Sequence, residues 1–232
     1  MSINAKEMLN QMIKEMKESE YIRLEAIPDI NLYMDQVTTF MDEHLAKSRR
    51  HPDDKILTKT MINNYAKNRL LPPPEKKKYS KEHMLLLIFI YYFKGILSIS
   101  DIQTLLGPLT ERFFAGSAGA LTLADIYQEV FSLERPQIEK LCLDVQEKYA
   151  MSTTIFTDVP EEEQEELQFF ALICLLGFDV YMKKQMIERM LDQACASREA
   201  AQETASSSRQ KSDSRSRSHS RQKDVSGEQD LS

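Results

Sequence analysis

Tryptophan is absent from this chain of 232 residues, and glycine occurs only six times. An all-β sandwich needs many tight turns, and glycine is a residue that such turns favour, so this scarcity argues against that class. The twelve methionines and the recurrence of apolar residues three and four positions apart instead favour helices nearly throughout. We predict an all-α fold, a helical bundle with a small hairpin at most.

Cysteine is also scarce, and its spacing argues against two common structural roles. Cys142, Cys174 and Cys195 are odd in number and far apart, which fits neither a disulfide framework nor a zinc site. Free cysteine behaves as a small hydrophobic residue, so we interpret the three as buried thiols in a reducing cytosol. No secretory signal pattern is present at the start, and we expect a cytoplasmic protein.

The sequence contains no pattern typical of an active site. His44, His51, His83 and His219 have no partner at metal-ligand spacing and no nucleophile motif nearby. The run FFAGSAGA at 113–120 has no preceding strand and no lysine at the spacing of a phosphate-binding loop, so we interpret it as a flexible loop. We expect no catalytic residue, no metal and no cofactor, and we predict that the protein is not an enzyme.

The apolar runs are too short to cross a membrane. Residues 84–93 are all apolar, but a spanning helix needs roughly 20 such residues. We predict that this run lies in a helix opened by Ser80, at the buried centre of the domain. A second apolar stretch follows the glutamates 161–163 in a helix predicted to reach Ala196. Asp179 interrupts it, so we expect it in the protein body or in a subunit interface.

Before the C-terminal tail, strong positive charge is concentrated in one segment, although the whole chain carries a net charge of −6. Residues 55–81 contain eight lysines and arginines and one acidic residue, a local net charge of +7. Residues 122–195 contain 15 acidic and six basic residues, a net charge of −9. Because phosphate binding depends on local charge, only the first of these segments is suited to a polyanion.

The basic segment begins with a predicted amphipathic helix from Lys59 to about Leu70, with Thr58 as its N-cap. Positions three and four apart share a face, so a mostly apolar inner face is separated from an outer face of hydroxyl, amide and ammonium groups. Such groups hydrogen-bond to base edges and phosphates. The inner face carries Ile62, Tyr65, Ala66 and Arg69, and the outer face carries Thr60, Asn63, Asn64 and Lys67.

Three consecutive prolines, Pro72 to Pro74, end this helix because proline lacks an N–H and pushes the preceding residue toward extended geometry. A lysine-rich turn and a tyrosine follow. The segment therefore combines a polar helix face with a cationic turn, and DNA is the ligand that fits both. The predicted DNA-binding residues are Lys59, Thr60, Asn63, Asn64, Lys67, Arg69, Lys76, Lys77, Lys78 and Tyr79.

The run TMINNYAKNRLLPPPEKKKYSKEHMLLLIFI resembles the recognition helix, wing and following helix of the MerR-type winged helix-turn-helix. Residues 62–65 fall on the start of that pattern, Leu70 and Leu71 on the helix end, and Tyr79 on the wing closure. Asn63 and Asn64 stand where the pattern has an arginine and a tyrosine. With LSISDIQ further along, the segment resembles still more closely an uncharacterised bacterial family, domain of unknown function 1836, over roughly residues 25 to 150.

The resemblance implies a DNA-binding transcriptional regulator with a winged helix-turn-helix in residues 25–110. Its partner would be double-stranded DNA, with Asn63, Asn64 and Lys67 in the major groove and Lys76 to Lys78 on phosphates. We expect no membrane partner, leave homodimer formation open and identify no small-molecule effector. The alternative is a non-enzymatic helical adaptor that binds another protein through an apolar helix face.

Apolar periodicity and capping residues predict the remaining helices. Residues 3–18 carry an apolar stripe that packs either on the same chain or on a second subunit. Four further helices are predicted. The first is capped by Asp29, and the second begins at Ser98 and Asp101 and ends at Gly107 and Pro108. The third runs from Thr122 and Asp125 to about Leu133, and the fourth begins or kinks at Pro136.

Four regions follow from these boundaries. They are an amphipathic helix in 1–20, the DNA-binding domain in 25–110, a helical region for packing, dimerisation or effector binding in 121–196, and a tail in 197–232. The tail is rich in serine and arginine and has almost no apolar residue to bury, so we predict that it is disordered.

Overall fold

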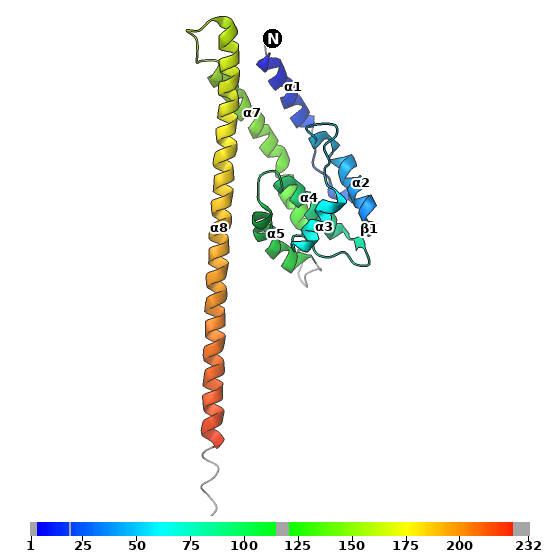
Figure 1. Ribbon diagram of the computed structural model, residues 1–232, viewed down its shortest axis with the longest axis vertical. Coiled ribbons are helices and arrows are strands. Elements are labelled where there is room, and N and C mark those ends of the chain that lie inside the picture. The colour runs from blue at the N-terminus through cyan, green and yellow to red at the C-terminus, as the bar shows by residue number, and fades with distance from the viewer. Residues whose placement is uncertain (1–3, 19, 115–120, 225–232) are drawn as a thin grey trace, which may run out of the picture. The chain divides into compact units, whose positions relative to one another are not determined.

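We analysed a computed structural model of the chain, which describes residues 4–18, 20–114 and 121–224, with side chains up to Ala201. It divides into two compact units, residues 1–186 and 187–232, and each unit is described by itself. The helical bounds are α1 Ala5–Glu18, α2 Met34–His44, α3 Lys59–Lys67, α4 Lys81–Phe93, α5 Ile99–Phe113, α6 Leu123–Ser132, α7 Glu134–Ser152 and α8 Glu161–Asp224. Two short strands, β1 Leu32–Tyr33 and β2 Lys78–Tyr79, and two 3-10 turns, Leu24–Ala26 and Ala46–Ser48, complete the described elements (Figure 1).

These elements confirm the mostly helical fold that the sequence predicts. The strands pair antiparallel, with Leu32 opposite Tyr79 and Tyr33 opposite Lys78. The partner of β2 is therefore a strand far upstream in the sequence. This pairing brings the lysine-rich turn that precedes β2 beside the start of α2.

Helix α4 is the centre of the core, as its unbroken apolar run predicts. Every residue from His83 to Ile90 is buried, because α5, α6 and β2 all pack against this helix. The predicted start at Ser80 is also confirmed. The Ser80 backbone N–H donates to Nδ1 of His83 at 3.0 Å, and the His83 backbone N–H returns to the Ser80 side chain as a capping box.

An aromatic cluster fastens α6 to α4. The Tyr127 ring lies 5.6 Å from Phe89 and 4.4 Å from Phe131, in edge and tilted contacts that aromatic pairs prefer. Its hydroxyl donates to the Ile22 carbonyl at 2.5 Å, and burial raises the pKa of the Tyr127 phenol. The cluster therefore connects the segment at Ile22 with α4 and α6.

The N-terminal stripe packs within the chain, against α7. Leu9 and Ile13 form one buried cluster with Cys142, and partly buried residues of α7 pack against it. Cys174 and Cys195 are only partly buried, so the prediction of buried thiols holds fully for Cys142 alone.

The second helix begins later than the sequence predicts. Asp29 does not cap it, because Leu32 and Tyr33 pair with β2 before the helix starts at Met34. Tyr33 is the N-cap, and its backbone N–H donates to Gln36 Oε1 at 2.8 Å. The prediction fails because the strand pairing is a long-range interaction that local capping rules do not contain.

Helix α5 begins at the predicted box of Ser98 and Asp101 but passes through Gly107 and Pro108 to Phe113. The predicted end near Leu106 is therefore wrong. Proline clashes with the backbone N–H and the Cβ of the residue before it, and Gly107 has no Cβ, which removes one part of that clash. The expected loop at 113–120 begins within this helix at Phe113, and residues 115–120 lie outside the described part of the chain.

Helices α6 and α7 begin close to the predicted positions, and α6 also ends close to its predicted end. Thr122 and Asp125 form the predicted capping box, and α6 ends at Ser132. Pro136 lies in the first turn of α7, where its missing N–H has no intrahelical partner to lose.

Helix α8 begins at Glu161, at the predicted glutamate run, and its first part is joined to α7 by Lys148, whose Nζ pairs with Asp179 at 3.0 Å. The backbone continues as helix to Asp224, beyond the boundary predicted at Ala196. No proline or glycine occurs between 197 and 224, so nothing in that stretch forces an end. Among the described residues, no helix is long and apolar enough to cross a membrane.

Candidate nucleic-acid interface

Helix α3 presents two chemically different faces. Thr58 caps it as predicted, since its side-chain oxygen accepts the Met61 backbone N–H at 3.1 Å. Ile62 is 0% exposed and Tyr65 5%, and α2 packs on this inner side. Thr60, Asn63 and the other predicted outer residues are exposed, so the helix is held by one face and leaves the other to solvent.

The end of α3 exposes a cation through an unusual backbone conformation. The helix stops at Lys67 rather than near Leu70, because Arg69 adopts a left-handed conformation with φ of 56°. The Leu70 N–H donates to the Tyr65 carbonyl at 2.9 Å and the Arg69 N–H to Ala66 at 3.2 Å, which is the Schellman pattern. Arg69 thus leaves the inner face predicted for it and lies on the surface.

The lysine-rich turn is also built from left-handed residues. Lys76 and Lys77 have φ of 48° and 65°, and the Lys78 N–H donates to the Glu75 carbonyl at 2.9 Å. Two central residues with positive φ are the mark of a type I′ turn, for which Asn-Gly is strongly preferred over lysine. Both lysine side chains are exposed.

The turn and the beginning of α3 both contact the start of α2. Tyr33 pairs with Lys78 in the sheet, and the Lys78 Nζ lies 5.1 Å from the centre of the Tyr33 ring. Two residues further on, Asp35 forms an ion pair with Lys59, the first residue of α3. In Figure 1, β1 and α3 are both labelled near the lower end of α2.

His83 packs against Tyr79, the residue that follows the lysine-rich turn and Lys78. Its ring makes edge contacts with Tyr79 at 5.4 Å and with Phe114 at 4.7 Å between ring centres. Burial lowers the pKa of His83, while the carbonyls of Pro73 and Pro72 and the charge of Glu82 oppose that shift. Nδ1 accepts the Ser80 N–H, so the neutral imidazole carries its proton on Nε2.

Eight of the ten predicted site residues are exposed on one stretch of chain. Lys78 is half-buried, and Tyr79 is 3% exposed, with the pKa of its phenol raised by burial. Tyr79 therefore acts as a core residue that holds the turn, and it offers little surface to a ligand. Among the described residues, no acidic side chain forms an ion pair with the four exposed cations Lys67, Arg69, Lys76 and Lys77.

Sequence reasoning missed the residues that position this surface. Tyr33 and Asp35 look like ordinary helix-start residues, and their contacts with Lys78 and Lys59 join segments far apart in the chain. His83 offered a local signal, because Ser80 and His83 have the spacing of a capping box.

Lys94 also supports α3, and no local sequence pattern indicated this role. Its Nζ donates to the Ile56 carbonyl at 2.6 Å, just before α3, and burial lowers its pKa.

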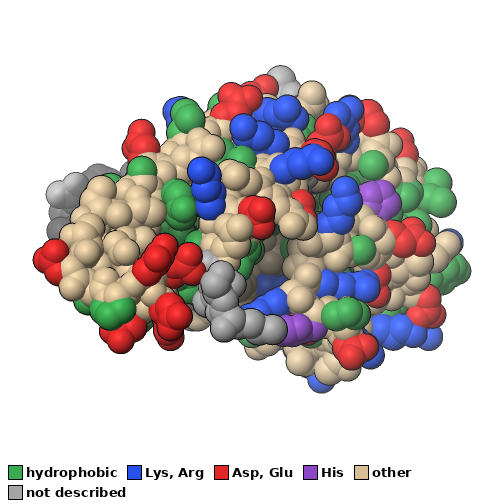
Figure 2. Space-filling model, turned by 90° about the horizontal axis from the view of Figure 1, so that it is seen from above, with side chains coloured by type: hydrophobic (Ala, Val, Ile, Leu, Met, Phe, Trp, Pro, Cys, Tyr) green, Lys and Arg blue, Asp and Glu red, His purple; other side chains and the backbone are tan. Residues whose placement is uncertain are grey.

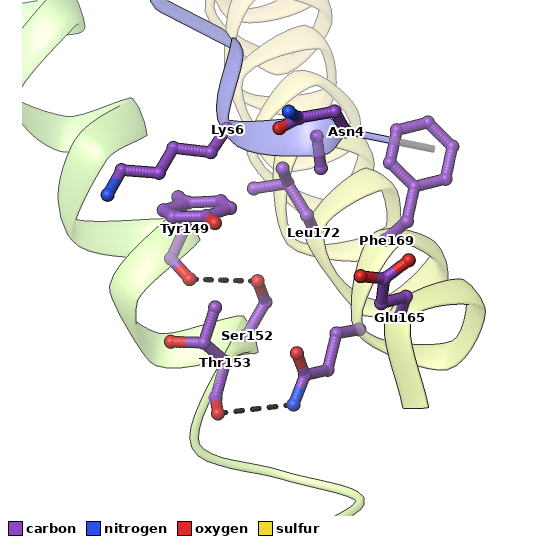
Figure 3. Close-up of a pocket in the computed structure, with 10 residues that line it drawn as sticks. Asn4, Lys6, Tyr149, Ser152, Thr153, Glu165, Phe169 and Leu172 are labelled. Carbon is purple, nitrogen blue, oxygen red and sulfur yellow. Dashed lines mark hydrogen bonds between the residues drawn. The ribbon is translucent and has the colours of Figure 1, made fainter. Parts of the chain in front are cut away.

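A second feature, a cleft of about 290 Å³, lies between the start of α1, the end of α7 and the start of α8 (Figure 3). Much of its polar lining is already engaged within the protein. Asn4 Oδ1 accepts the Glu7 N–H, Ser152 donates to the Tyr149 carbonyl, and Gln168 donates to the Thr153 carbonyl. The first two bonds are local, and the Gln168 bond joins α8 to the residue that follows α7.

The charge pattern differs between surfaces. Figure 2 shows a face on which acidic and basic side chains are mixed. The exposed residues of α3 and of the following turn, by contrast, include cations and amides and only Glu75 as an acid. Among the described residues, no group of three or more acidic, histidine or cysteine side chains could hold a metal ion.

Comparison with known proteins links this same part of the chain to a family. Residues 22–130 match the family described as Domain of unknown function (DUF1836), and this match supports the resemblance to that family. It spans β1, α2, α3, the turn and α4 to α6. No curated protein and no solved structure gives a significant match.

Proposed function

We propose that the protein is a DNA-binding transcriptional regulator of the MerR-like winged-helix type. The observation that carries the proposal is the outer face of α3, where the exposed amides Asn63 and Asn64 are followed by the cations Lys67 and Arg69, which form no ion pair with a described residue. A helix of this kind fits the major groove, where asparagine reads adenine and cations contact phosphates. Asn63 and Asn64 would read bases, and Lys67, Lys76 and Lys77 would bind the backbone.

Contacts with the rest of the protein hold α3 in a fixed position, which favours binding of its outer face to a ligand as a rigid unit. Ile62 and Tyr65 anchor it to the core, Thr58 caps its start, and the Lys59–Asp35 pair links that start to α2. The turn at 75–78 takes the place of the wing in this proposal. Double-stranded DNA is the proposed partner, and the protein acts without catalysis or cofactor in the cytoplasm.

The direct test is selection of bound sequences from a pool of random duplexes by the full chain, followed by affinity measurements at two salt concentrations. We expect an enriched motif and an affinity that falls steeply with salt, with a slope of about −0.9 for each phosphate contacted. Replacing Lys76, Lys77 and Lys78 by alanine should weaken binding to all duplexes alike. Equal loss on replacing three exposed lysines elsewhere, Lys14, Lys17 and Lys47, would contradict the assignment.

A second proposal concerns α8, whose first part exposes large apolar side chains. Phe170 is 63% exposed, Phe178 64% and Tyr181 57%, and their spacing places them on one side of the helix. We propose that this face binds a second copy of the chain, because regulators with short reading helices gain affinity by binding two half-sites as dimers. Light scattering of the purified chain should then give twice the monomer mass.

The same face supports the alternative function, a helical adaptor that binds another protein. A chain that is monomeric, binds no duplex from the random pool and retains a defined protein partner through Phe170 and Phe178 would favour the adaptor. A dimer that selects a DNA motif would favour the regulator.

A further inference from the structure

Three of the four non-glycine residues with positive φ in the described part of the chain are cations of the candidate interface. Arg69 follows the end of α3, and Lys76 and Lys77 form the tip of the turn. Left-handed backbone is unfavourable for residues with a Cβ, and glycine or asparagine normally occupies such positions. The fold alone would therefore favour other residues at all three positions.

The three side chains form no stabilising polar contact with the described part of the protein. They are exposed, and no ion pair or side-chain hydrogen bond is formed by Lys76, Lys77 or Arg69 with another described residue. Strain kept at positions without a structural benefit points to a function for the side chains. Their common chemistry is positive charge, which identifies an anionic ligand.

The positions of these cations relative to α3 define the ligand further. The turn is tied to the beginning of α3 through Tyr33 and Asp35, whereas Arg69 lies just beyond its end. Nine helical residues span about 13 Å. This is close to the width of about 12 Å of the major groove of B-form DNA, which phosphates line on both sides.

We infer that Arg69 and the pair Lys76–Lys77 are phosphate-binding residues that bracket α3 and contact the two strands on opposite sides of one major groove. The inference rests on the proposed function and deepens it, because it specifies B-form duplex DNA as the ligand. Single-stranded DNA has no second strand to complete the bracket, and the major groove of duplex RNA is too deep and narrow for a helix.

Two variants of the full chain test this. Lys76→Asn with Lys77→Gly gives the turn its preferred residues, and Arg69→Gly does the same at the end of α3. We expect each variant to melt higher than the parent, by roughly 2 to 8 °C for relief of strain in a domain of this size. We expect the salt slope of duplex binding to fall by about 2 in the turn variant and about 1 in the Arg69 variant.

A matched control separates charge from backbone strain. Lys76→Gln with Lys77→Gln removes the same charges but keeps side chains at the strained positions, so it should lose the same affinity without the rise in melting temperature. Lys14→Gln with Lys17→Gln removes two charges from α1 and should change neither quantity.

Binding to one duplex sequence, as DNA and as RNA, and to the single strand completes the test. We expect the variants to lose at least tenfold in affinity for duplex DNA and much less for the weaker ligands. Variants that melt higher yet keep parental DNA affinity would overturn the inference and leave the proposed function standing. A parent chain that binds no duplex DNA would instead remove the proposed function itself.

Discussion

The outer face of α3 and the exposed face of α8 are both left free by the fold, but their chemistry is opposite. The α3 face is polar and cationic, and the backbone that follows the helix is strained at Arg69, Lys76 and Lys77. The α8 face is apolar, with Phe170 and Phe178 more than half exposed on a regular helix. The difference suggests two kinds of partner, a polyanion for α3 and an apolar protein surface for α8.

The largest expected effect is a loss of stability on substitution in the buried face of α3. Ile62→Ala should lower the free energy of unfolding by about 2–5 kcal/mol, because a fully buried side chain leaves a cavity in the core. Chemical denaturation measures this loss. A loss below about 1 kcal/mol would mean that α3 is not anchored through this face, and the rigid presentation of the outer face would have to be abandoned.

The next effect is on sequence preference. Asn63→Ala and Asn64→Ala should change the free energy of unfolding by less than about 0.5 kcal/mol, since both side chains are exposed. Each should reduce discrimination against the wrong base by about 1–3 kcal/mol. Competition between the selected motif and single-base variants measures the reduction. Unchanged discrimination in both variants would assign the base contacts to other residues.

His83 provides a pH-dependent test of the support beneath the turn. Burial places its pKa below the ordinary value of 6.5, so the unfolded chain binds a proton that the folded chain resists. Stability should therefore be full above about pH 7 and fall as the pH drops through 6.5 toward the folded pKa. His83→Gln should remove this dependence, which melting curves between pH 7.5 and 5.5 would show. A parent chain with equal melting temperature across that range would contradict the assignment.

The smallest expected effect is on α8. Phe170→Gln with Phe178→Gln should change the stability of the monomer by less than about 0.5 kcal/mol, because both rings face solvent. The same change should shift the mass measured by light scattering from dimer to monomer. At the lowest protein concentration the chain is monomeric. A large loss of stability there would show that Phe170 and Phe178 pack within the chain, and α8 would then have no free apolar face to compare with α3.

Much of the fold followed from local rules. Ser98 with Asp101 and Thr122 with Asp125 fixed two helix starts, the apolar run at 84–93 marked the central helix, and Thr58 marked the start of α3. Capping and periodicity depend on residues within one or two turns, so the sequence displays them directly. The basic character of residues 55–81 was visible in the same way.

The failures share a cause, which is that distant or neighbouring contacts override a local preference. Asp29 is a good cap, but pairing of Leu32 with Tyr79 delays α2. Pro108 is a good stop, but α5 passes through it, and Gly107, which has no Cβ, removes one part of the clash that disfavours a helical residue before proline. Tyr79 looked like a surface residue of the turn, and the aromatic contact with His83 places it in the core.

The sequence by itself determined that the protein is helical, that its centre is the apolar helix 81–93 and that a strongly basic segment, residues 55–81, leads into that centre. These properties are set by composition and spacing along the chain. Only the tertiary structure decided that Arg69 leaves the inner face of α3 and that Lys78, next to the turn, and Lys59, at the start of that helix, both contact the start of α2. Backbone φ angles and the pairing of Tyr33 with Lys78 depend on contacts between segments, and no local pattern records them.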